Sequence, residues 1–273
     1  MLINKERLEI EKNCVKLNHC LYLTPQNTVI KDCLQSNNCP DFLAERILFV
    51  SQLPFINGYT HPANVFQEYG DVYGYEMQNL SGYINIGDFL TSLNKQKALR
   101  LPFEIKKLIL QKVLMCLREL NKEYVISDIN IHNIMFNSFG DGMIIDWENG
   151  TPITDNYPTL CLYELGSISN GIQADSLKLF TCALSLLYEY DFSSVLMYVP
   201  LDRFIKILQN LDVDPLIRNF IDDFSYELNI GSSRVVYFDE YLNRIVDIQE
   251  EQISRVKTQI FSEYYNDTIG ILK

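Results

Sequence analysis

The chain has no long apolar run and no excess of positive charge. No apolar stretch approaches the ~18 residues that a membrane-spanning helix needs, so membrane insertion is not expected. Asp and Glu number 35 against 23 Lys and Arg, a formal net charge of −12, whereas non-specific binding to nucleic acid or anionic membranes requires a basic surface. The opening MLINKERLEIEK alternates charged with apolar residues, unlike a signal peptide. We therefore expect a cytoplasmic protein that binds no nucleic acid and offers any anionic ligand a local positive site.

Cysteine pairs at the spacing of metal ligands are also missing. The seven cysteines stand at positions 14, 20, 33, 39, 116, 161 and 182. An odd number of scattered cysteines is typical of reduced thiols in a cytosolic protein, so we expect small buried side chains. The chain has no internal repeat. With 273 residues, 47% of them hydrophobic, it is long enough for a well-packed interior and two lobes.

Residues 124–148, YVISDINIHNIMFNSFGDGMIIDWE, contain the clearest candidate site. Two short apolar runs around a G-D-G turn predict a β-hairpin over residues 134–145. Asp128 and Asn133 precede the hairpin and Asp146 ends it, so the second acid returns towards the first. Mg²⁺ favours such oxygen ligands and usually takes one or two carboxylates together with substrate phosphates. Asp128 is then left free to act as a base.

This spacing resembles the catalytic loop and metal-binding hairpin of protein kinases, H-R-D-x-x-x-x-N followed by D-F-G. The resemblance assigns Asp128 as the catalytic residue that orients and deprotonates a substrate hydroxyl. It assigns Asn133 and Asp146 as ligands of Mg²⁺.

Three positions depart from the kinase pattern. Ile126 replaces the His, and Glu148 replaces the Gly of D-F-G. Asn130 replaces the Lys that protein-serine kinases usually carry two residues after the Asp. Loss of that charge near the γ-phosphate favours a slow or specialised enzyme.

Residues 14–33 alternate in three short β-type runs separated by turns. The third run ends at Lys31 and is similar to the V-A-I-K strand, whose Lys grips the α- and β-phosphates; the alternative is a solvated Lys at a strand end. Residues 41–53 predict a helix capped by its first residue. Glu45 on this helix resembles the αC glutamate that pairs with the kinase lysine and helps to hold ATP; the alternative is an exposed acid, which is common in the first turn of a helix. No glycine occurs before Gly58, so the glycine-rich phosphate loop of the family is missing.

The resemblance implies an α+β, bilobal protein kinase-like fold. Residues 1–78 would form a small antiparallel β lobe and residues 79–273 a larger helical lobe, with ATP in the cleft between them. The family places its adenine-binding hinge at this boundary. Glu76, Met77 and the strand residue Met135 are accordingly expected to contact the nucleotide.

Periodic apolar residues predict helices over residues 103–121, 175–190 and 239–265. The first resembles the kinase helix that supports the catalytic loop. At the start of the second, Asp175 matches the Asp that anchors the backbone of that loop. Glu164 matches the A-P-E motif, and Arg234 is its candidate partner. Ile126 and Trp147 match the hydrophobic spine of the family and are expected to stack with Phe49 in a buried column.

Three functions fit this pattern. A protein serine/threonine kinase is favoured by Glu164 and Arg234, and we expect transfer of the γ-phosphoryl group of Mg²⁺-ATP to a hydroxyl. A small-molecule kinase of the aminoglycoside or choline type is favoured by the D-W-E triplet at Asp146. A pseudokinase that acts as a binding module is favoured by the missing glycine loop, Ile126 and Asn130.

Overall fold

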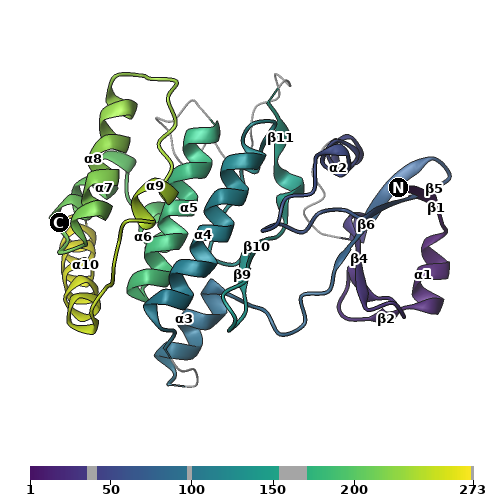
Figure 1. Ribbon diagram of the computed structural model, residues 1–273, viewed down its shortest axis with the longest axis horizontal. Coiled ribbons are helices and arrows are strands. Elements are labelled where there is room, and N and C mark those ends of the chain that lie inside the picture. Colours follow the sequence, from purple (N-terminus) through teal and green to yellow (C-terminus); the bar gives the residue numbers. More distant parts are fainter. Residues whose placement is uncertain (36–41, 97–99, 154–170, 272–273) are drawn as a thin grey trace.

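The computed structural model describes residues 1–35, 42–96, 100–153 and 171–271. It is a mixed α+β protein in which a six-stranded sheet lies at one end and most helices lie at the other (Figure 1). The predicted α+β class is confirmed. None of the described helices is long and apolar enough to cross a membrane.

The six-stranded sheet has the strand order β1-β5-β6-β4-β3-β2. Its strands are β1 (Leu2–Asn4), β2 (Val15–Lys16), β3 (Leu21–Leu23), β4 (Thr28–Asp32), β5 (Asn64–Glu68) and β6 (Asp71–Gln78). Neighbouring strands are antiparallel except β1 and β5, which are parallel. The three strands predicted within residues 14–33 are confirmed as β2, β3 and β4, whereas no sequence pattern indicates β1.

Two helices cover opposite faces of this sheet, α1 (Arg7–Asn13) and α2 (Leu43–Gln52). Successive side chains of a strand point to opposite faces. Ile30 of β4 therefore packs in one cluster with Ile10 of α1, while Val29 belongs to the main core together with Ile47 of α2. The cap predicted at the first residue of the second helix lies outside the described residues.

Strands β4 and β6 approach each other closely at Gly74, which pairs with Asp32. A Cβ atom at Gly74 would lie 2.1 Å from the carbonyl oxygen of Lys31, far inside van der Waals contact. Glycine is therefore required here for steric reasons. The close pairing places Lys31 directly opposite Tyr75.

The remaining helices are α3 (Ile86–Asn94), α4 (Phe103–Leu120), α5 (Gly171–Tyr188), α6 (Phe192–Tyr198), α7 (Leu201–Asn210), α8 (Pro215–Asn229), α9 (Asp239–Leu242) and α10 (Glu250–Ile271). Helix α4 confirms the prediction over residues 103–121. Helix α5 starts four residues earlier than expected, at Gly171 rather than Asp175, and is buried from Gln173 to Tyr188. It lies beside α4 and α6 (Figure 1).

The single helix predicted over residues 239–265 is wrong, because α9 ends at Leu242 and α10 begins at Glu250. The ammonium group of Lys107 on α4 donates to the carbonyl oxygens of Asn243 at 3.2 Å and Ile245 at 2.6 Å. These carbonyl groups accept hydrogen bonds from a side chain instead of from the backbone N–H groups of a continuing helix. The tertiary contact therefore prevails over the helix that the apolar periodicity predicts.

Two small sheets lie between the large sheet and the helices. One has the order β10-β9-β7 and consists of β7 (Ile84–Asn85), β9 (Ile134–Phe136) and β10 (Gly142–Ile144). The other pairs β8 (Tyr124–Val125) with β11 (Thr151–Pro152). The described residues also include the 3₁₀ turns η1 (Cys33–Gln35) and η2 (Trp147–Asn149). The predicted hairpin over residues 134–145 is confirmed by β9 and β10.

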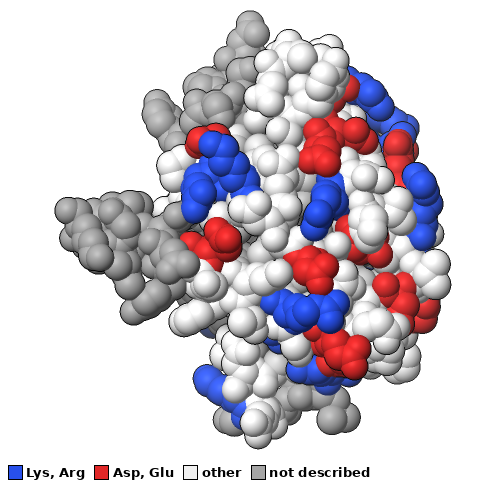
Figure 2. All heavy atoms as spheres, turned by 90° about the vertical axis from the view of Figure 1, so that its left-hand side faces the viewer, with Lys and Arg blue, Asp and Glu red and all other residues white. Residues whose placement is uncertain are grey.

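The described cysteines are all free, and those on the sheet and helices are mostly buried. Cys20, Cys33, Cys116 and Cys182 are buried and Cys14 is half-buried, as expected for small apolar side chains; the other two lie outside the described residues. On the face of the molecule seen in Figure 2, acidic and basic side chains are interspersed, and no broad basic patch forms there.

Candidate nucleotide and metal site

Asp175 anchors the backbone of the loop between β8 and β9. Its carboxylate accepts the backbone N–H groups of Ile126 at 2.7 Å and Ser127 at 2.9 Å, and the side-chain amide of Asn121 at 3.1 Å. Complete burial raises the pKa of Asp175 to about 6, although these hydrogen bonds act to lower it. The predicted anchoring contact is confirmed.

Ser127 holds a left-handed backbone conformation immediately before Asp128, with φ 68°. Such a conformation is uncommon for a residue other than glycine and persists only where the surroundings fix it. Lys178 of α5 donates to the carbonyl oxygen of Ser127 at 2.9 Å. The backbone N–H and the carbonyl group of Ser127 are therefore both held by side chains of α5.

The carboxylate of Asp128 is oriented by two asparagine side chains. The amide groups of Asn130 and Asn149 each donate to a different carboxylate oxygen, both at 3.0 Å. Asn133 donates through its amide nitrogen to the carbonyl oxygen of Asp128 at 2.9 Å. Its amide oxygen is thereby turned away from the loop and can serve as a ligand.

The β9–β10 hairpin brings Asp146 beside Asn133. The backbone N–H of Ile145 donates to the carbonyl oxygen of Asn133 at 2.9 Å, so the end of the hairpin is fixed to its beginning. Asp146 has a φ of 56°, and 46% of its side chain is exposed. Its carboxylate therefore reaches solvent at the end of the hairpin.

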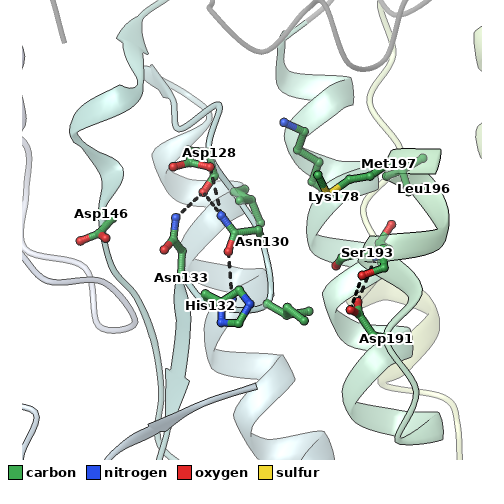
Figure 3. A pocket seen from close by; sticks show the side chains of 14 residues that line it. Asp128, Asn130, His132, Asn133, Asp146, Lys178, Asp191, Ser193, Leu196 and Met197 are labelled. Carbon is green, nitrogen blue, oxygen red and sulfur yellow. Dashed lines mark hydrogen bonds between the residues drawn. The ribbon is translucent and has the colours of Figure 1, made fainter. Parts of the chain in front are cut away.

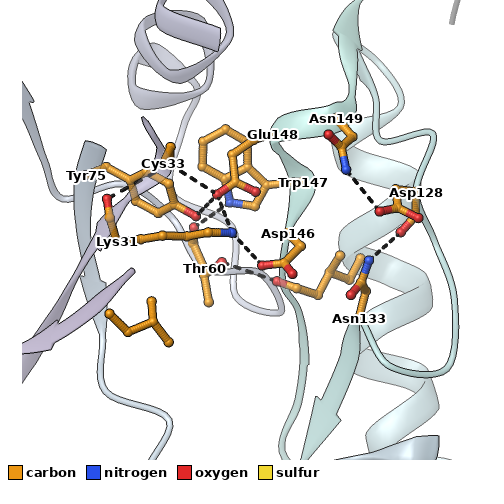
Figure 4. Close-up of polar contacts among 12 residues, drawn as sticks. Lys31, Cys33, Thr60, Tyr75, Asp128, Asn133, Asp146, Trp147, Glu148 and Asn149 are labelled. Carbon is orange, nitrogen blue, oxygen red and sulfur yellow. Dashed lines mark hydrogen bonds and ion pairs between the residues drawn. The ribbon is translucent and has the colours of Figure 1, made fainter. Parts of the chain in front are cut away.

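Lys31 forms ion pairs with Asp146 at 2.7 Å and with Glu148 at 2.9 Å (Figure 4). Burial acts to lower the pKa of Lys31, but the carboxylates of Glu148 and Asp146 outweigh it and raise this pKa well above its ordinary value. Lys31 therefore carries a positive charge at every physiological pH. The fixed cation that an anionic ligand requires is present.

The predicted ion pair between Lys31 and Glu45 is wrong. Helix α2 buries Leu43, Ile47 and Val50, and the helical period of 100° per residue turns Glu45 outward to solvent. The buried side chain that α2 directs to the site is Arg46, which donates to the carbonyl oxygen of Glu148 at 3.3 Å.

Glu148 was not among the sequence-predicted site residues, yet its carboxylate is 7% exposed and is held on several sides. The hydroxyl of Tyr75 donates to it at 2.5 Å and the thiol of Cys33 at 3.9 Å. The departure from D-F-G at this position was the available signal. The sequence alone does not indicate that Lys31 pairs with Glu148 and not with Glu45.

The buried column predicted from Ile126, Trp147 and Phe49 is confirmed only in part. Ile126 and Trp147 are both buried in the main core, at 0% and 1% exposure. The aromatic partners differ from the prediction. Trp147 packs against Tyr75 with ring centroids 5.1 Å apart, and Phe49 stacks on Tyr124 at 6.1 Å.

A cavity of about 620 Å³ lies between the large sheet and the β9–β10 hairpin. Its lining comprises Leu17, Asn18, His19, Cys20, Leu21, Leu23, Val29, Lys31, Met77, Gln78, Asn79, Leu80, Ser81, Met135, Ile145 and Asp146. Apolar side chains thus line a hollow that has Lys31 and Asp146 at one side. Met77 and Met135 line it as expected.

Glu76 does not line this cavity, contrary to expectation. In β6 the side chains alternate between the two faces, and the carboxylate of Glu76 accepts hydrogen bonds from the hydroxyl of Thr28 and from the amide of Asn64 at 2.6 Å. Its carbonyl oxygen accepts the backbone N–H of Ala63 at 2.8 Å. Glu76 is therefore a structural residue of the sheet.

The β2–β3 turn lies over the cavity, which it lines with Leu17, Asn18, His19 and Cys20. Asn18 forms this turn by accepting the backbone N–H groups of Cys20 and Leu21, both at 2.9 Å. Asparagine side chains stabilise turns in this way without a glycine. A tight turn over the cavity is thus present although the sequence has no glycine there.

A second cavity of about 510 Å³ adjoins the loop between β8 and β9. Figure 3 shows Asp128, Asn130, His132 and Asn133 on one side of it and residues of α5 and α6 on the other. Asp146 lines this cavity as well as the first.

The donor set fits a magnesium ion that is shared with phosphate. No group of three or more His, Cys, Asp or Glu side chains able to hold a metal occurs among the described residues. Asp146 offers a partly exposed carboxylate and Asn133 an amide oxygen, which is the small oxygen set that Mg²⁺ uses with substrate phosphates. These two residues would hold the ion.

The predicted partnership of Glu164 and Arg234 cannot be placed, because Glu164 lies outside the described residues. Arg234 forms an ion pair with Glu227 at 3.1 Å.

No protein-family model matches the chain, and a search of curated proteins finds no match either.

Proposed function

We propose that the chain is a Mg²⁺-ATP-dependent phosphotransferase with a bilobal protein kinase-like fold, composed of the β-rich residues 1–78 and the helical residues 79–273. The observation that carries the proposal is the shared position of Asp146 in two adjoining cavities. Lys31 lines the first and Asp128 the second. A nucleotide with its base in the first cavity would direct its terminal phosphate towards Asp128.

Each side chain has a distinct role in this reaction. Mg²⁺-ATP supplies the γ-phosphoryl group when it is bound, with Asn133 and Asp146 as protein ligands of the metal. Lys31 neutralises phosphate charge, as phosphoryl transfer depends mainly on positioning and electrostatic stabilisation. Asp128 orients the acceptor hydroxyl and accepts its proton.

Asn130 supports a slow reaction. Its amide donates to Asp128 at 3.0 Å, so it orients the base but adds no positive charge where kinases carry a lysine. Electrostatic stabilisation of the developing charge is reduced accordingly.

The acceptor is an alcohol group, for which a protein serine or threonine is the expectation from the kinase resemblance. A small-molecule alcohol is the second candidate, because the cavity beside Asp128 is bounded by Ser193 of α6 and by its N-cap Asp191 and has a size suited to a compact ligand. A pseudokinase that acts as a binding module is the third; the placement of Lys31, Asp128 and Asp146 around two adjoining cavities supports an enzyme over it.

Thermal unfolding with ATP tests this proposal. At 100-fold excess over Kd a ligand of the native state stabilises it by about 2.7 kcal/mol, which corresponds to a Tm increase of roughly 5 °C or more for a chain of this size. We expect this increase with Mg²⁺-ATP and a much smaller one for ATP with EDTA. Asp146→Asn, the matched control, should abolish the effect of Mg²⁺ without lowering the Tm of the free protein. Equal shifts in both proteins would refute the metal role of Asp146.

A further inference from the structure

Four consecutive residues, from Asp146 to Asn149, each make a contact that serves the site. Asp146 and Glu148 both pair with Lys31. Asn149 donates to the carboxylate of Asp128 at 3.0 Å. The segment thus joins Lys31 and Asp128, which are far apart in the sequence, as Figure 4 shows.

The segment is itself firmly fixed by Trp147. Its indole N–H donates to the carbonyl oxygen of Thr60 at 2.8 Å, and its own carbonyl oxygen accepts the hydroxyl of Tyr124 at 3.2 Å. The ring is buried against Tyr75. Since Trp147 also begins the η2 turn that carries Glu148 and Asn149, the side chains on either side of Trp147 have little freedom to move apart.

We infer that residues 146–149 act as one positioning unit, in which Glu148 orients Lys31 and Asn149 orients Asp128, so that the lysine is held independently of Glu45 on α2. This inference rests on the proposed phosphotransfer function. Glu148 and Asn149 are positioning residues, because they act through Lys31 and Asp128 and do not themselves touch the nucleotide or the acceptor.

Burial separates the role of Glu148 from that of Asp146. The side chain of Glu148 is 7% exposed and that of Asp146 is 46% exposed. Glu148 lines neither of the two cavities described above, whereas Asp146 lines both. Its carboxylate is already engaged by Lys31 and Tyr75. Glu148 therefore holds the lysine from the buried side, whereas Asp146, which also pairs with Lys31, keeps a partly exposed carboxylate that can reach a metal.

The contact of α2 is with the backbone of this unit. Arg46 donates to the carbonyl oxygen of Glu148, and Glu45 is exposed. Rotation of α2 would therefore not withdraw a carboxylate from Lys31, as it would if Glu45 were the partner. The position of Lys31 is fixed by the segment that carries the metal ligand Asp146. Movement of α2 would therefore not control the position of Lys31.

Kinetic measurements test the two positioning roles separately. Glu148→Gln removes the charge that holds Lys31 while keeping the shape, and should lower kcat/KM for ATP at least about tenfold. Glu45→Gln is the matched control and should change it less than twofold. Asn149→Ala should lower kcat about tenfold with the KM for ATP unchanged, because it removes one hydrogen bond to a charged group. An equal loss in Glu45→Gln and Glu148→Gln, or a loss confined to KM in Asn149→Ala, would overturn the corresponding role.

A second measurement does not depend on catalysis. The rate at which an amine-reactive acetylating reagent labels Lys31 at pH 8, read by mass spectrometry, reports the fraction of neutral amine. Loss of the Glu148 charge should increase that rate about tenfold or more, since one pKa unit is tenfold in neutral amine, while Glu45→Gln should leave it unchanged. Should Glu148→Gln lack the native tryptophan emission, Glu148→Asp, which withdraws the carboxylate by one methylene, replaces it and should give a smaller increase. An unchanged rate in a folded variant, or an increase in Glu45→Gln, overturns the inference; an increase without any phosphotransfer would refute the proposed function alone.

Discussion

Substitution of Asp175 by Asn gives a quantitative test of how the loop between β8 and β9 is anchored. Asp175 is fully buried, and its pKa of about 6 lies above the unfolded value of about 3.9. The stability contributed by its protonated form is therefore fully present below pH 4 and is lost as the pH rises through 6. About two pKa units correspond to about 3 kcal/mol.

Asn cannot ionise, so the variant does not lose stability at this position as the pH rises through 6. We expect the free energy of unfolding of Asp175→Asn, relative to that of the wild type, to increase by up to about 3 kcal/mol between pH 4 and pH 7. Urea unfolding at several pH values, followed by far-UV circular dichroism, measures this difference. Phosphotransfer should still fall, because Asn offers one acceptor oxygen to the N–H groups of Ile126 and Ser127 that now bind two.

A difference that stays constant, or that decreases as the pH rises, would refute this reasoning. It would mean that the hydrogen bonds to Asp175 outweigh its burial, so that the folded protein prefers the carboxylate.

Two further predictions concern Trp147 and Gly74. Because the indole of Trp147 is 1% exposed, its fluorescence should be blue-shifted and poorly quenched by iodide; the emission of a solvated indole would contradict the buried column. Gly74→Ala places a Cβ atom 2.1 Å from the carbonyl oxygen of Lys31, so it should destabilise the fold by about 1–3 kcal/mol and weaken ATP binding. Gly70→Ala meets no atom within 4 Å, but its φ of 95° strains the backbone, so it should destabilise the fold while leaving ATP binding to the folded protein unchanged. Chemical unfolding and nucleotide titration of both variants test this, and equal ATP affinity in Gly74→Ala and the wild type would show that the β4–β6 contact does not position Lys31.

The parts of the site that could be predicted are those fixed by short-range spacing. Asp128 and Asn133 are five residues apart in one loop, and a hairpin necessarily returns Asp146 to its own beginning. The predicted strands and the buried α4 follow from apolar periodicity. Asp175 could be predicted only through the resemblance, because nothing in its local sequence indicates a contact with Ile126 some fifty residues earlier.

The parts that could not be predicted depend on which face of an element is buried. Helix α2 was expected to direct Glu45 inward, but its apolar residues set a phase that buries Arg46 instead. Glu76 similarly sits on the opposite face of β6 from the cavity. Glu148 contacts both Tyr75 and Lys31, which are neighbours in the sheet. This contact depends on tertiary structure, so the local sequence does not indicate it.

The central claim is that Asp128 is the base of a phosphotransferase. The direct measurement is transfer of label from [γ-³²P]ATP with Mg²⁺, to the protein itself, to cell-extract protein and to a panel of small alcohols, with wild type and Asp128→Asn purified side by side. Since general-base catalysis contributes about 10²–10⁴-fold, we expect wild type to incorporate label and Asp128→Asn to lose at least about 100-fold of the rate while retaining the affinity for Mg²⁺-ATP. Equal incorporation by the two proteins, or none by wild type with any acceptor, would contradict the claim.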